Sequence, residues 1–216
     1  MPKLDVVIKG GTVIDGLRTP RHKADVGIVG GRVVQIGRVD AADGRDVVDA
    51  SGKVVAPGFV DLHTHYDSQV FWDPWCTMSA WHGVTSVVIG NCGFGFAPCR
   101  PEDRERAMLT VSRNEAVPLK TMRVGMPWDW VTYPEFLDSV ERTLKGVNVM
   151  SFVPLAPLYA YVAGVDNAKA YVSPPSSSTR CADCSLKEWR PAVAASARRS
   201  PERWGTSSST TTARPW

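Results

Sequence analysis

Two histidines and one cysteine are the residues of this sequence that could bind a metal ion together. His63 and His65 lie two positions apart at the end of the apolar segment of residues 51–66, SGKVVAPGFVDLHTHY. Side chains two positions apart on a strand point the same way, so the two imidazoles can share one ion. Cys92 follows a second apolar run, VTSVVI at 84–89, and its thiolate would be a soft donor that zinc accepts beside imidazoles. The alternatives are histidines held by hydrogen bonds in a loop and a buried, inert cysteine.

The segments around these residues predict alternating strands and helices. We expect an edge strand at 54–55, a turn at 56–58, a buried strand at 59–62 and a helix at 74–83 that ends at His82 and Gly83. His82 then acts as a helix cap rather than a metal ligand. The β-branched run 84–89 predicts a strand buried on both faces, and residues 147–153 predict a third strand. Carboxyl ends of adjacent parallel strands carry the site in α/β barrels, which favours a metal site here.

The residues before this region predict a small β domain. Residues 4–8, 12–14, 25–28 and 32–37 are β-rich runs, separated by the turn-forming dipeptides Gly10-Gly11, Asp15-Gly16 and Gly30-Gly31. His22 lies in a polar stretch between them, which favours a solvated loop histidine. Cys92 lies between Gly90 and Gly93, whereas Cys76 and Cys99 have no such flanking glycines. We expect Cys76 and Cys99 to be packing residues that bind no metal.

Length, charge and hydropathy exclude several classes of protein. A complete eight-stranded α/β barrel needs about 250 residues, and this chain has 216. The chain has 25 basic and 22 acidic residues, and seven of the basic and three of the acidic ones fall after residue 170. The part up to residue 170 therefore has 18 basic and 19 acidic residues and no basic patch for binding nucleic acid. No apolar run approaches the ~20 residues of a membrane span, and the start lacks a signal-peptide core, so we expect no membrane partner and a cytoplasmic location without disulfides.

Two longer motifs resemble a known family. PGFVDLHTHYD and GVTSVVIGNCGFGFAPCRPEDRE are similar to the amidohydrolase superfamily, and specifically to the N-acyl-D-amino-acid deacylase (D-aminoacylase) family. The separation from His63 to Cys92, 92 − 63 = 29, fits that family. PWDWVTYPEFLDSVE at 127–141 resembles its insertion and the helix before its third barrel strand. The resemblance covers roughly residues 4–170.

The resemblance implies an α/β fold with a partial TIM-like (β/α) barrel of about three strands at 57–170, after an incomplete β-sandwich-like domain at 1–56. It implies zinc-dependent hydrolysis of the amide bond of N-acyl-D-amino acids, with His63, His65 and Cys92 as metal ligands. The family also requires two histidines from later strands and a catalytic aspartate, and none of these has a counterpart here. We therefore expect a truncated, inactive form with no catalytic residue; the alternative is a non-catalytic binding or remnant protein.

Residues 171–216 differ in composition from the rest. These 216 − 170 = 46 residues contain three aliphatic residues of the Ile/Leu/Val/Met set, too few to build a core, which predicts a disordered tail. An evolved tail and out-of-frame translation of a GC-rich coding sequence both explain it, and the abrupt end of the resemblance favours the frameshift. The CADC motif at 181–184 is a weak metal or redox signal, and 185–199 is the one candidate helix.

Overall fold

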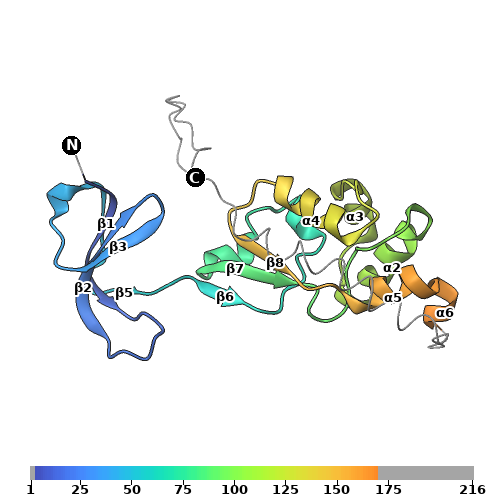
Figure 1. Ribbon diagram of the computed structural model, residues 1–216, viewed down its shortest axis with the longest axis horizontal. Coiled ribbons are helices and arrows are strands. Elements are labelled where there is room, and N and C mark those ends of the chain that lie inside the picture. Colours follow the sequence, from blue (N-terminus) through green and yellow to red (C-terminus); the bar gives the residue numbers. More distant parts are fainter. Residues whose placement is uncertain (1–2, 170–216) are drawn as a thin grey trace, which may run out of the picture. The chain divides into compact units, whose positions relative to one another are not determined.

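A computed structural model describes residues 3–169, which divide into two compact units between Pro57 and Gly58 (Figure 1). We call residues 3–57 unit 1 and residues 58–169 unit 2. The predictions for the tail, the CADC motif and the helix at 185–199 lie outside the described residues. No helix within 3–169 is long and apolar enough to cross a membrane.

Unit 1 is built on one mixed sheet. Its strands are β1 (Leu4–Val13), β2 (His22–Val29), β3 (Arg32–Gly37), β4 (Gly44–Asp49) and β5 (Val54–Val55), with a 3-10 turn η1 (Ala41–Asp43) before β4. The order is β3-β2-β1-β4, with β5 also paired to β1; β2 runs antiparallel to β1 and β3, and β4 and β5 run parallel to β1. A second sheet, which a sandwich-like domain would need, is not seen among the described residues of this unit.

Two local predictions for unit 1 are wrong. Gly10-Gly11 does not make a hairpin turn, because β1 continues through it with a register shift between Ile8 and Gly11, and Gly10 takes a φ of +71°. The positive φ bends the strand without ending it, as in a β-bulge. His22 is exposed as expected, but it begins β2 instead of lying in a loop. The turn predicted at Gly30-Gly31 is confirmed, since both residues have positive φ between β2 and β3.

A partly buried ion pair ties the bulge of β1 to β2. The Asp25 carboxylate accepts hydrogen bonds from Lys9 Nζ at 2.7 Å and from the backbone N–H groups of Gly10 at 2.8 Å and Val39 at 3.0 Å. These donors, first of all Lys9, lower the pKa of Asp25 to about 2. The carboxylate therefore holds three segments of the chain at one point.

Unit 2 contains three parallel strands with helices between them. The strands are β6 (Phe59–Asp61), β7 (Val84–Ile89) and β8 (Asn148–Ser151), with β7 in the centre (Figure 1). Phe59 and Val60 are 64% and 53% exposed, so the expectation of a buried first strand is wrong. β6 is an edge strand with one neighbour, and one neighbour leaves its apolar side chains uncovered. The unit is thus mixed α/β, and the predicted strands at 84–89 and 147–153 are confirmed.

Helical segments lie between and after these strands, and several of them pack on one face of the sheet. They are η2 (Gln69–Phe71), α1 (Thr77–Trp81), η3 (Pro101–Asp103), α2 (Arg104–Glu115), α3 (Leu119–Gly125), α4 (Tyr133–Arg142), α5 (Leu155–Ala163) and α6 (Val165–Lys169). Val87 and Ile89 of β7 pack into a core with Trp130, Tyr133 and Phe136. The helix predicted at 74–83 is the shorter α1, capped by His82 and by Gly83 at φ +80°, as expected.

Candidate metal centre

The two loops that carry the candidate ligands leave adjacent strands and are tied together. β6 ends at Asp61, so His63 and His65 lie beyond the strand and not on it. Between them, Thr64 donates its backbone N–H to Val88 O at 3.0 Å and its hydroxyl to the same oxygen at 2.8 Å. Asn91, next to Cys92, donates its amide to Leu62 O at 2.9 Å. These bonds hold both loops at the carboxyl end of the sheet.

The structure brings His63, His65 and Cys92 together. One donor atom from each residue lies within 4.8 Å of the other two, although strand alternation, the basis of the prediction, does not produce the convergence. The two imidazole rings stack with centroids 5.3 Å apart, and His65 Nδ1 lies 3.8 Å from Cys92 Sγ. All three side chains are exposed, so a metal ion could reach them from solvent. His82 and His22 take no part in this cluster.

The donor set fits zinc. Zinc bound tetrahedrally by nitrogen at 2.0–2.1 Å and by sulfur at 2.3 Å requires its donors to be roughly 3.3–3.6 Å apart. The observed separations, up to 4.8 Å, need closure by about an ångström, which side-chain rotation in two exposed loops can supply. Two imidazoles and a thiol are also the donor types that favour zinc over magnesium or calcium.

Glu115 completes the surroundings of the cluster and was not found from the sequence. It is the last residue of α2, and its carboxylate Oε1 lies 2.8 Å from His65 Nδ1 and 3.6 Å from Cys92 Sγ. Its side chain is only 9% exposed. A single acidic residue at a helix end, 50 positions after His65 (115 − 65), has no local motif that would reveal it.

A second acidic group lies beneath the cluster. Asp67 is 7% exposed, and burial, together with the nearby Glu115 carboxylate, raises the pKa of Asp67 to about 7, although the backbone N–H of Gly90 donates to it. The thiol of Cys92 also has a raised pKa, first from burial and then from the charge of Glu115. Three acidic groups, Asp67, Cys92 and Glu115, therefore crowd a site whose basic side chains, among the described residues, are His63 and His65. An added cation would relieve this crowding.

The other described cysteines lie apart from the cluster. Cys76 and Cys99 are buried, and burial raises the pKa values of their thiols to about 11 and about 12. Such thiols stay protonated and unreactive. The expectation that both fill space agrees with their burial.

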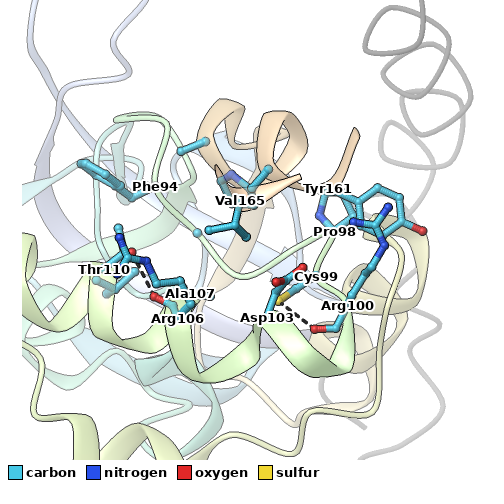
Figure 2. Close-up of a pocket in the computed structure, with 15 residues that line it drawn as sticks. Phe94, Pro98, Cys99, Arg100, Asp103, Arg106, Ala107, Thr110, Tyr161 and Val165 are labelled. Atoms are coloured by element: carbon cyan, nitrogen blue, oxygen red, sulfur yellow. Dashed lines mark hydrogen bonds between the residues drawn. The ribbon is translucent and has the colours of Figure 1, made fainter. Parts of the chain in front are cut away.

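A cavity of about 240 Å³ lies between α2, the loop after β7 and the helices α5 and α6 (Figure 2). Figure 2 shows Phe94 and Thr110 toward one end, Arg100 and Tyr161 toward the other, and Val165 between them. The guanidinium of Arg100 lies 4.6 Å from the centroid of the Tyr161 ring. None of the three donors lines this cavity, so it is separate from the metal cluster.

Comparisons with known proteins agree with this geometry. Residues 46–150 match the sequence model of the amidohydrolase family. The D-aminoacylase of Alcaligenes xylosoxydans xylosoxydans is 36% identical over 158 residues, 73% of this chain and 30% of that protein. The N-acyl-D-glutamate deacylase of the same organism is 51% identical over 96 residues, 44% of this chain and 20% of that protein.

A solved structure extends the likeness to the fold. The N-acyl-D-glutamate deacylase of Bordetella bronchiseptica, complexed with zinc and a phosphonate inhibitor that mimics the tetrahedral intermediate, superposes with a TM-score of 0.68 and 32% identity. The match covers 84% of this chain and 35% of that one, so the chain spans about a third of this relative. Residues 46–150 therefore match the amidohydrolase family, and the chain is similar to the N-terminal part of the D-aminoacylases, as the sequence predicts.

Proposed function

We propose that unit 2 is the first part of a metal-dependent amidohydrolase barrel and that His63, His65 and Cys92 hold zinc. The observation that carries this proposal is the convergence of three zinc-type donors within 4.8 Å at the carboxyl ends of adjacent parallel strands. The zinc in the Bordetella bronchiseptica deacylase supports the choice of metal. The family match and the three parallel strands support the barrel.

The substrate class follows from the relatives. Their names specify D-aminoacylase and N-acyl-D-glutamate deacylase, so we propose the amide bond of an N-acyl-D-amino acid as the bond on which this lineage acts. Bound zinc would polarise the amide carbonyl and lower the pKa of a water molecule. His63 and His65 would contribute neutral imidazole lone pairs, and Cys92 would bind as the thiolate after losing its proton.

The same reasoning limits what this chain can do alone. In the deacylases that it resembles, two later histidines and an aspartate complete the site, and no histidine follows His82 in this sequence. We therefore propose that the 216-residue chain binds zinc without hydrolysing N-acyl-D-amino acids at a measurable rate. Three protein donors without the later ligands should bind zinc more weakly than a complete site.

Competition with a chromophoric chelator tests the metal site. The parent chain should bind zinc, and Cys92→Ala and His65→Ala should each weaken binding at least tenfold, because each removes one of three donors. His22→Ala is the matched control, since it removes an exposed histidine from unit 1 and should change nothing. If Cys92→Ala binds zinc as well as the parent, Cys92 is not a ligand.

Turnover tests the rest of the proposal. Release of the free amino acid from N-acetyl-D-glutamate, with zinc present, should stay at the rate of a no-protein blank. Measurable zinc-dependent hydrolysis would show that the described donors are sufficient and that the incomplete-site proposal is wrong. A chain that neither binds zinc nor turns over substrate would favour the non-catalytic alternative.

A further inference from the structure

The Glu115 side chain is placed where a carboxylate is energetically unfavourable. It is 9% exposed, and burial of a charged carboxylate is costly unless it is paired. It is the last residue of α2, where the negative end of the helix dipole repels an anion. The following residue, Ala116, takes a φ of +55°, which non-glycine residues rarely adopt. Two energetic costs at Glu115 and one at the next residue indicate that the contacts of the Glu115 carboxylate matter.

Those contacts are specific. Oε1 of Glu115 accepts from His65 Nδ1 at 2.8 Å and is approached by the Cys92 thiol at 3.6 Å. Among the described residues, no lysine or arginine forms an ion pair with it. The carboxylate therefore faces two of the three candidate metal ligands and no lysine or arginine of the part of the chain that the structure describes.

A hydrogen bond to one imidazole nitrogen decides what the other can do. In a neutral histidine one ring nitrogen carries the proton and the other carries the lone pair. A carboxylate 2.8 Å from Nδ1 stabilises the proton there and leaves the lone pair on Nε2, the nitrogen free to bind a metal. Carboxylates that hold metal-binding histidines in this way fix the orientation of the ring and raise its basicity.

We propose that Glu115 is a positioning residue for the metal site: it holds His65 in the Nδ1–H form, so that Nε2 is presented to zinc. The inference rests on the proposed function for the identity of the metal, but the form of His65 does not depend on metal. Glu115 acts through His65 and is not itself a ligand. α2 thereby connects the metal site to the helical layer of unit 2.

The first test uses the metal-free chain. The whole sequence has four histidines, so ¹⁵N NMR of the imidazole groups can be assigned with single substitutions. In the parent chain near pH 8, His65 should show the Nδ1–H form. In Glu115→Leu, which has no acceptor, the Nε2–H form should become the major one, and Glu115→Gln, with a neutral acceptor, should fall between them. An unchanged His65 spectrum in folded Glu115→Leu would overturn the inference.

The second test measures metal binding in the same variants. Zinc affinity should fall by about 10 to 100-fold in Glu115→Leu, the range found when such partners are removed, and by less in Glu115→Gln. Glu141→Leu, which changes an exposed acid of α4, is the matched control and should bind like the parent. Affinity within about twofold of the parent in folded Glu115→Leu would overturn the inference.

Cobalt distinguishes positioning from direct ligation. Cobalt bound in place of zinc should give the same visible bands in the parent and in Glu115→Gln, because the ligand set is unchanged. A clear shift of those bands would show that Glu115 binds the metal directly and would overturn its role as a positioning residue. If the parent binds neither metal, the proposed function fails, while the NMR comparison still decides how Glu115 acts on His65.

Discussion

Gly90 follows the last residue of β7 and begins the loop to Cys92, and Gly90→Ala should destabilise unit 2. Gly90 has a φ of +79°, and a Cβ atom there would lie 2.5 Å from the backbone oxygen of Phe152. The left-handed conformation costs an alanine about 1–2 kcal/mol. Overlap with a backbone atom cannot be relieved by side-chain rotation and should add about 1–3 kcal/mol. We expect a total loss of roughly 2–5 kcal/mol in the free energy of unfolding.

Gly93→Ala separates the two contributions. Gly93 has a similar φ of +85° in the same loop, but the nearest atom to its Cβ would be Leu155 Cβ at an ordinary 3.9 Å. This variant should therefore lose about 1–2 kcal/mol in the free energy of unfolding, which is the cost of the left-handed conformation alone. Urea unfolding followed by tryptophan fluorescence measures both, and none of the eight tryptophans precedes Trp72, so the signal does not come from unit 1.

The difference in the free energy of unfolding between Gly90→Ala and Gly93→Ala tests whether the overlap with Phe152 matters. If Gly90→Ala is within about 0.5 kcal/mol of Gly93→Ala, the close approach of β7 and β8 at Phe152 does not constrain the site. Gly90→Ala should also weaken zinc binding more than Gly93→Ala, because the overlap displaces the start of the Cys92 loop. Equal zinc affinities would contradict that link between strand packing and the site.

Three further results are expected. Trp130→Ala should destabilise unit 2 by about 3–5 kcal/mol in the same urea assay, because Trp130 is 1% exposed; a loss below about 1 kcal/mol would contradict its place in the core. The pKa of Asp25 is lowered to about 2, chiefly by Lys9, against ~3.9 unfolded, so its stabilisation is present above pH ~4 and lost as the pH falls toward 2. Circular dichroism should detect this loss, and Asp25→Asn, which lacks the titrating group, should not show that acid-dependent step. Val60→Thr with Met150→Thr should reduce the binding of a hydrophobic dye, since both side chains are exposed on the sheet; unchanged dye fluorescence would place the apolar surface elsewhere.

The sequence predicts best those parts of the fold that local pattern determines. The β-branched run of β7 is apolar on both faces, and Gly30-Gly31 fits a tight hairpin, so both were found. β4, whose sequence is GRDVVD, gives no strand signal because four of its six residues are charged or glycine. Its place in the sheet comes from parallel pairing with β1, which no local pattern encodes.

The candidate metal site likewise has parts that the local sequence predicts and parts that depend on the folded chain. His63, His65 and Cys92 are chemically distinctive and follow apolar runs, so residue type and position were enough to select them. Alternation along a strand does not explain their convergence, because β6 stops at Asp61 and hydrogen bonds across the loops bring the side chains together. Glu115 could not be found, since its role depends on where α2 ends in space.

The pairing of β1 in unit 1 has a consequence for synthesis on the ribosome. β1 ends at Val13 and its parallel partner β4 begins at Gly44, 44 − 13 = 31 residues later. At about 5–20 residues per second, roughly 2–6 s pass between the emergence of the two strands, whereas a hairpin forms in about 1–10 μs. The meander of β1, β2 and β3 can therefore assemble first and wait with one edge of β1 unpaired. During those seconds the nascent chain exposes the unpaired edge of β1. A chaperone bound in this interval would protect that edge most.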